Sequence, residues 1–176
     1  MNFAEPSKNV LQMGLADGMR VADFGAGTGA YAFAAAGAVG PAGHVYAIDV
    51  QEDVLAHLRD AANQRGLKNV EAIWGDIERP GGTKLRDHVL DAAILSNVLF
   101  QVEDKKAALA ELARVLKPHA KLLVADWAGS YGGIGPSDEQ IVPEHEAEEL
   151  FITAGFHKVK SFRAGPHHYA ILFSCP

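Results

Sequence analysis

Short apolar runs alternate with amphipathic stretches along the chain, and this alternation predicts its fold class. Seven runs have the composition of β-strands, and several of them are mainly apolar. They cover residues 20–24, 44–48, 70–74, 89–95, 121–126, 156–162 and 167–173. Strands buried on both faces of a parallel sheet have this continuous apolar character.

Helical spacing of apolar residues marks most of the segments between these strands. We expect helices over residues 6–15, from the end of a glycine-rich loop to 38, and over 52–65, 104–116 and 143–154. In the first of them, Val10, Leu11 and Leu15 fall on one face. Strands alternating with helices predict an α/β domain with a mostly parallel sheet covered on both faces.

Turns and loops complete this prediction. Residues 117–120 are expected to turn into the fifth strand, and 128–142 form the longest loop, which we expect on the substrate side. Only residues 163–166 separate the last two strands, which is short enough for a hairpin, so one of the two is antiparallel.

Length and composition favour one domain over residues 1–176, with 1–19 as a short N-terminal helical segment. No apolar run approaches the roughly 20 residues of a membrane helix, and the N-terminal residues lack a signal-peptide pattern. The one cysteine, Cys175, excludes an intramolecular disulfide framework and a multi-cysteine metal site. We therefore expect a cytoplasmic protein with no membrane span and no metal site.

The charge pattern argues against nucleic acid as a partner. The net charge is −6, and the longest basic run is Lys105-Lys106. Proteins that bind nucleic acid usually carry a basic face that displaces counterions from phosphates. A small-molecule partner fits this composition better. The sequence leaves the oligomeric state open, and a dimer is compatible with it.

The first strand is followed by the loop Gly25-Ala26-Gly27-Thr28-Gly29. Alternate glycines let the backbone turn sharply and approach a ligand, and the next helix points its unpaired N–H groups at that ligand. The loop alone leaves alternatives open, because Gly25, Gly27 and Ala30 also satisfy the dinucleotide pattern GxGxxA. A tight turn without a ligand is a further reading.

Three aspartates narrow these alternatives. Asp23 lies two positions before Gly25, Asp49 ends the second strand, and Asp76 follows the third. A carboxylate beside the loop suits an ammonium group better than a pyrophosphate, and one at the end of the second strand can accept both ribose hydroxyls. Asp76 can accept from an adenine amino group. Each of these aspartates alone could be a turn or cap residue, but together they occupy the strand edge where ligands bind in open α/β sheets.

These motifs make the sequence similar to the class I S-adenosylmethionine-dependent methyltransferases over essentially the whole chain. VADFGAGTG resembles their first motif, VYAIDV the acidic second strand and IWGDI the adenine-contacting third strand. DAAILSNVLFQV and LARVLKPHAKLLVADW resemble the fourth strand and the following helix, turn and strand. The closest similarity is to the small-molecule branch that includes the quinone-pathway C-methyltransferases.

The resemblance implies a Rossmann-like fold with sheet order 3-2-1-4-5-7-6 and an antiparallel seventh strand. It also implies S-adenosylmethionine as cofactor, with S-adenosylhomocysteine as product, and a role for each matching residue. The methionine end would be held by Asp23 and the loop residues Gly25, Ala26, Gly27 and Gly29. The nucleoside end would contact Asp49, Val50, Asp76 and Ile77, with Ser96 and Asn97 beside the cofactor.

The acceptor side carries no comparable signature. Many relatives have a histidine after the fourth strand, where this chain has Leu99-Phe100-Gln101-Val102, so histidine catalysis there is not expected. Topology places Asp126, Tyr131 and His145 at the cofactor edge, and these are the candidate catalytic residues. Arg163, His167 and His168 belong to the same rim if the seventh strand is antiparallel.

Three other functions share some of these features. A nicotinamide-dependent oxidoreductase would use the glycine loop and Asp49, but not Asp23 and Asp76. A non-catalytic protein that binds S-adenosylmethionine or S-adenosylhomocysteine would use every cofactor residue. An RNA or protein methyltransferase would need a local basic surface that the sequence does not show.

Overall fold

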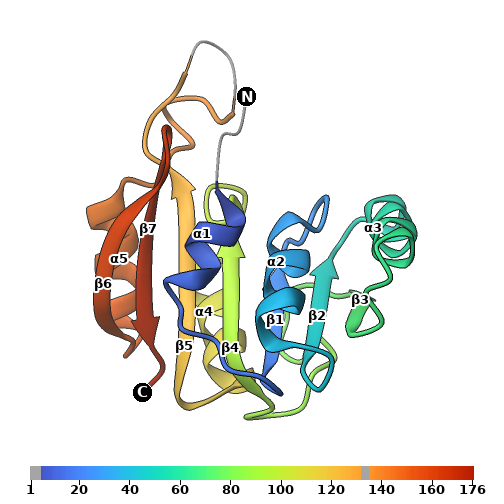
Figure 1. Ribbon diagram of the computed structural model, residues 1–176. Coiled ribbons are helices and arrows are strands. Elements are labelled where there is room, and N and C mark those ends of the chain that lie inside the picture. The colour runs from blue at the N-terminus through green and yellow to red at the C-terminus, as the bar shows by residue number, and fades with distance from the viewer. Residues whose placement is uncertain (1–4, 132–134) are drawn as a thin grey trace.

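The computed structural model describes residues 5–131 and 135–176 of the chain. Seven strands form one sheet in the order β3-β2-β1-β4-β5-β7-β6 (Figure 1). The strands are β1 Arg20–Phe24, β2 His44–Asp49, β3 Val70–Trp74, β4 Leu90–Ser96, β5 Leu116–Trp127, β6 His157–Gly165 and β7 His168–Ser174. β7 runs antiparallel to both β5 and β6, and the other pairs are parallel. The predicted Rossmann-like sheet, its order and its antiparallel last strand are confirmed.

Helices cover both faces of the sheet. They are α1 Pro6–Leu11, α2 Ala30–Val39, α3 Glu52–Gln64, α4 Lys105–Val115 and α5 Glu144–Thr153. One buried core lies under α1, α2 and α3, and a second lies under α4 and α5 (Figure 1). The small side chains Ala32, Ala35 and Ala36 are fully or nearly fully buried, which lets α2 pack closely on the strands.

The strand directions position the ligand edge. β1, β2 and β4 are mutually parallel through β1, so Phe24, Asp49 and Ser96 all end at one edge of the sheet. Figure 1 shows the arrowheads of β2, β4 and β5 pointing to that edge, towards the top of the view. Side chains at the ends of three strands therefore converge there.

The fifth strand begins earlier than predicted. Residues 117–120 were expected to form a turn, but β5 is continuous from Leu116, with His119 in the left-handed region at φ 63°. Leu116 pairs with Leu90 and Lys121 pairs with Ala92, so the extra residues form a bulge inside the ladder. The pairing of Leu116 with β4 and the backbone hydrogen bonds of His119 and Ala120 with Cys175 keep the predicted turn within the strand.

Two further expectations are corrected. Leu11 was placed on the buried face of the first helix, but it is 74% exposed, because α1 ends there and buries Asn9 and Val10 instead. The hairpin joint was expected at 163–166. β6 continues to Gly165 and β7 begins at His168, so the joint is the two residues between them.

Among the described residues, no helix is long and apolar enough to cross a membrane. Two predicted segments are only partly covered. Residues 1–4 of the N-terminal segment 1–19 and residues 132–134 of the loop 128–142 lie outside the described residues.

Candidate functional site

A cavity of about 640 Å³ lies at the carboxyl ends of β1, β2 and β4. It brings together ten of the eleven residues predicted to contact a cofactor, namely Asp23, Gly25, Ala26, Gly27, Asp49, Val50, Asp76, Ile77, Ser96 and Asn97. Gly29 does not line the cavity. It precedes α2 in the left-handed conformation, with φ 82°.

The glycine loop follows the end of β1 and is bonded to β2. The N–H groups of Gly25 and Ala26 both donate to the carbonyl of Ile48, at 2.8 and 3.0 Å. Gly25 has φ 68°, and a Cβ added there would lie 2.2 Å from Cγ2 of Val98. A side chain at this position would therefore be strained in its backbone and would collide with the cavity wall.

Asp49 holds the same loop from the end of β2. Its carboxylate accepts hydrogen bonds from the N–H groups of Gly27 and Gln51, both at 3.0 Å. The residue is 8% exposed and lines the cavity. One carboxylate thus fixes the loop and can still offer its remaining lone pairs to a ligand hydroxyl.

Asp23 is a buried carboxylate that lacks a full set of partners. It is 2% exposed, and its Oδ2 atom has no hydrogen-bond partner among the described residues. Burial raises the pKa of Asp23 to about 7, the backbone N–H of Ala32 opposes this rise, and the charge of Asp49 adds to it. A cation bound in the cavity would satisfy this oxygen and favour its ionised form.

Asp76, in the segment after β3, lines the cavity, and its carboxylate already has partners within the protein. Its carboxylate accepts from the N–H of Glu78 at 2.9 Å and pairs with Nε of Arg79 at 3.0 Å. The Arg79 side chain is 76% exposed, so this pair is open to solvent. An adenine amino group would have to share the Asp76 carboxylate with these partners.

Glu111 in α4 holds the same segment. Its carboxylate accepts hydrogen bonds from the N–H groups of Gly81 and Thr83 and from the Thr83 hydroxyl. Arg114 adds two more, from Nε at 2.8 Å and from Nη2 at 2.7 Å. The Glu111 side chain is 1% exposed and that of Arg114 is 27% exposed, so the segment following Asp76 is held by an ion pair with a buried carboxylate.

Comparisons of the sequence and of the structure with known proteins point to the same family. Residues 15–161 match the family model described as a methyltransferase domain. The crystal structure of a SAM-dependent methyltransferase from Aquifex aeolicus superposes with a TM-score of 0.90 at 30% identity, covering 99% of this chain and 91% of that one. The chain belongs to the class I S-adenosylmethionine-dependent methyltransferases.

Two curated relatives align with this chain over only part of their own length. The ubiquinone/menaquinone biosynthesis C-methyltransferase of Bordetella parapertussis is 38% identical over 111 residues, which is 63% of this chain and 42% of the relative. The aklanonic acid methyltransferase of Streptomyces sp. strain C5 is 30% identical over 136 residues, 76% of this chain and 60% of the relative. The methyltransferase domain thus spans less than two thirds of the length of either relative.

The three candidate catalytic residues are not brought together, and none lines the cavity of this methyltransferase. Asp126 is 2% exposed and accepts from the N–H groups of Leu99 and Trp127 at 3.0 and 2.8 Å. Burial raises the pKa of Asp126 to about 6, although those backbone hydrogen bonds oppose the rise. Through its hydrogen bond with Leu99, this carboxylate therefore holds the segment that follows β4.

The other two candidates lie farther out. The Tyr131 ring contacts the His167 ring, with centroids 3.9 Å apart, and Tyr131 is half-buried. The His145 side chain is 80% exposed in the first turn of α5, 4.0 Å from Glu146. The rim predicted from an antiparallel seventh strand does bring His168 against Trp127, with ring centroids 4.4 Å apart.

Sequence reasoning missed several cavity residues of the methyltransferase. Tyr31, Pro6, Gln101 and Val102 line the cavity without belonging to a predicted contact. Tyr31 has a local signal, since it stands two residues after Gly29 in the first turn of the helix that follows the loop. In the 99–102 run, Leu99 is 1% exposed and belongs to the core.

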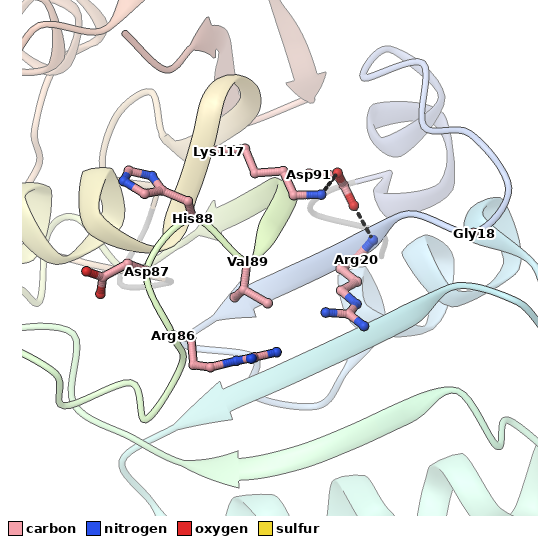
Figure 2. Close-up of a pocket in the computed structure, with 8 residues that line it drawn as sticks. All are labelled: Gly18, Arg20, Arg86, Asp87, His88, Val89, Asp91 and Lys117. Carbon is pink, nitrogen blue, oxygen red and sulfur yellow. Dashed lines mark hydrogen bonds and ion pairs between the residues drawn. The ribbon is translucent and has the colours of Figure 1, made fainter.

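A second hollow, of about 410 Å³, lies near the amino ends of β1 and β4 (Figure 2). Lys117 donates to Asp91 at 2.5 Å, and the other oxygen of Asp91 accepts from the backbone N–H of Arg20 at 2.9 Å. None of the predicted site residues lines this hollow. Ten of the predicted residues line the cavity at the carboxyl edge instead, which is the edge where ligands bind in open α/β sheets. Within the described residues, no cluster of histidine, cysteine and acidic side chains could hold a metal ion.

Proposed function

We propose that this methyltransferase transfers a methyl group from S-adenosylmethionine to a small-molecule acceptor. The observation that carries the proposal is the unpartnered, buried carboxylate oxygen of Asp23 beside the glycine loop. An ammonium group at that point would complete its hydrogen bonding, whereas a pyrophosphate would meet its negative charge. Family membership favours the same cofactor over a nicotinamide dinucleotide.

The residues that line the cavity fit the parts of this cofactor. Asp23 and the backbone of the glycine loop would hold the methionine end, and Asp49 the ribose. Val50 and Ile77 would enclose the adenine, with Asp76 at its amino group. When bound, the cofactor supplies a methyl group already activated on a sulfonium. The protein then contributes mainly position and electrostatics.

A small molecule is the acceptor class that the charge and the relatives favour. The two curated relatives are named for ubiquinone and menaquinone biosynthesis and for aklanonic acid. The chain has a net charge of −6 and no long basic run, which argues against nucleic acid. A general base is needed only for an acceptor that must lose a proton. Asp126, Tyr131 and His145 are proposed as acceptor-side residues, and a cytoplasmic location is proposed from the composition.

The direct test combines binding with turnover. Isothermal titration would compare S-adenosylmethionine, NAD and NADP. A radiolabelled methyl donor would then be offered with quinols, aromatic acids, RNA and protein. Binding of the methyl donor alone, with label in a small-molecule pool, is the expected result. Binding of nicotinamide cofactors alone would overturn the proposal, and tight binding without any label transfer would favour the non-catalytic alternative.

The charge of Asp23 predicts a pH dependence of cofactor binding. With a pKa of about 7, Asp23 is mostly ionised at pH 7.5 and mostly protonated at pH 6. The affinity for S-adenosylhomocysteine should therefore fall roughly tenfold as the pH drops over that interval, because only the carboxylate attracts the ammonium group. Isothermal titration at both pH values measures the change.

The variant Asp23→Asn supplies the control for this prediction. It removes the titrating group but keeps the size of the side chain, so its weaker binding should vary little over the same interval. A wild-type slope in Asp23→Asn would assign the pH dependence to another residue.

A further inference from the structure

A buried phenol lies in the cavity wall near Asp23, and the proposed reaction gives it no role. Tyr31 in the first turn of α2 is 6% exposed and lines the cavity. Its hydroxyl oxygen accepts a hydrogen bond of 2.8 Å from Nδ2 of Asn9. Asn9 belongs to α1 and is 2% exposed. A buried polar contact between two helices therefore forms part of this wall.

The orientation of the Asn9 amide is fixed by a third element. The same Nδ2 atom donates to the carbonyl oxygen of Ala164 in β6 at 2.9 Å. A carbonyl only accepts, so the amide nitrogen must face Ala164, and its second hydrogen points to Tyr31. The backbone N–H of Glu5 donates to the same carbonyl at 3.1 Å. One side chain thus joins α1, α2 and the β6–β7 hairpin.

The direction of this hydrogen bond decides what Tyr31 can offer the cavity. Its oxygen already accepts from Asn9, so its own hydrogen is available for another acceptor. No described residue receives that hydrogen at normal hydrogen-bond geometry, and the nearby Ser96 Oγ likewise has no partner of normal geometry there. Burial raises the pKa of Tyr31, the hydrogen bond from Asn9 and the nearby Ser96 hydroxyl oppose the rise, and the Asp23 charge adds to it. The hydroxyl stays protonated and lies close to Asp23.

We propose that Tyr31 donates this hydrogen to the carboxylate at the amino-acid end of the methyl donor, and that Asn9 is the positioning residue that aims it. The inference rests on the proposed function, because it needs the methionine group beside Asp23. That group carries an ammonium and a carboxylate. Asp23 matches the first by charge, and a hydrogen-bond donor matches the second. Helix α1 and the hairpin then take part in recognising the methyl donor.

The test uses two ligands that differ only at the amino-acid end. S-adenosylhomocysteine carries it, whereas 5′-methylthioadenosine keeps the nucleoside and the thioether and lacks it. Tyr31→Phe should weaken S-adenosylhomocysteine binding about 10-fold and leave 5′-methylthioadenosine within about 2-fold, as expected for loss of one hydrogen bond to a charged group. Isothermal titration gives both affinities.

The positioning role of Asn9 is tested through Tyr31. Asn9→Leu removes both donors and should weaken only S-adenosylhomocysteine, yet it should add no further loss in a Tyr31→Phe background. Tyr169→Phe is the matched control, since it deletes another buried hydroxyl, which donates to the carbonyl of Val142 at 2.9 Å outside the cavity. It should change neither affinity.

Each outcome discriminates. Equal losses for both ligands in Tyr31→Phe, or no loss for either, would overturn the inference while leaving the proposed function standing. Additive losses of affinity in the double variant would show that Asn9 does not act through Tyr31. If Asn9→Leu does not fold, Asn9→Asp gives the same test, because its carboxylate would accept the Tyr31 hydrogen and divert it from the ligand. Failure of the wild-type protein to bind either ligand would overturn the proposed function and the inference with it.

Discussion

Replacing Asp49 with alanine is expected to weaken S-adenosylhomocysteine binding by about 100-fold, because hydrogen bonds to a charged group contribute roughly 1.5–3 kcal/mol each. The carboxylate is 8% exposed at the end of β2 and lines the cavity. The variant would lose both the contacts that we propose to the ribose hydroxyls and the hydrogen bond from the N–H of Gly27. Isothermal titration of the purified variant measures the loss.

Two further variants separate these contributions. Asp49→Asn keeps one acceptor oxygen for the loop or the ribose, so its affinity should fall between those of Asp49→Ala and the wild type. Asp53→Ala removes an exposed carboxylate from the first turn of α3, and its affinity should match the wild type. The Trp74 indole donates to the carbonyl of Val50 at 2.8 Å, so its fluorescence offers a second binding signal at the same edge. An Asp49→Ala variant that binds like the wild type would show that the ribose lies elsewhere.

The ligand edge could be predicted from the sequence because its determinants are local. Asp23, the glycine loop, Asp49 and Asp76 each stand at or beside a strand end, and the parallel arrangement of the strands brings those ends together. The apolar runs determine where the strands lie, and the carboxyl ends of the strands determine where the ligand edge lies. Ten of the eleven predicted cofactor residues accordingly line one cavity.

Features that depend on distant pairing could not be predicted. The bond from Asn9 to Tyr31 spans 22 residues and the bond from Asn9 to Ala164 spans 155, with no motif at either end. The early start of β5 at Leu116 depends on its ladder with β4, whereas residues 117–120 alone favour a turn. Local preferences yield to tertiary contacts at these points.

The acceptor side was the least predictable part of the site. Asp126 was expected near the reacting groups. It lies one residue before the end of β5, and its carboxylate accepts hydrogen bonds from the N–H groups of Leu99 and Trp127. Which way a side chain turns at a strand end depends on the backbone groups that pack around it. The spacing of residues along the sequence does not show how such a side chain is oriented.

The largest loss of stability is expected from Glu111→Ala, at about 3–5 kcal/mol of the free energy of unfolding, the range measured when one partner of a buried ion pair is removed. The substitution leaves the N–H groups of Gly81 and Thr83 without their acceptor, and Arg114 keeps only its carboxylate partner Asp87. Urea unfolding at pH 7 measures the change. Glu148→Ala is the matched control, since its partly exposed pair with Lys158 should contribute less than about 1 kcal/mol.

The pH dependence of this difference tests its origin. Burial by itself would raise the pKa of Glu111, but hydrogen bonds from Arg114, Thr83 and Gly81 outweigh it and hold the pKa at about 2. A carboxyl with a lowered folded-state pKa stabilises the protein above its unfolded value of about 4.3 and loses that contribution as the pH falls towards 2. The gap between wild type and Glu111→Ala should therefore narrow from pH 7 to pH 3. A gap that stays constant with pH would assign the loss to packing, and a gap no larger than that of Glu148→Ala would contradict the prediction.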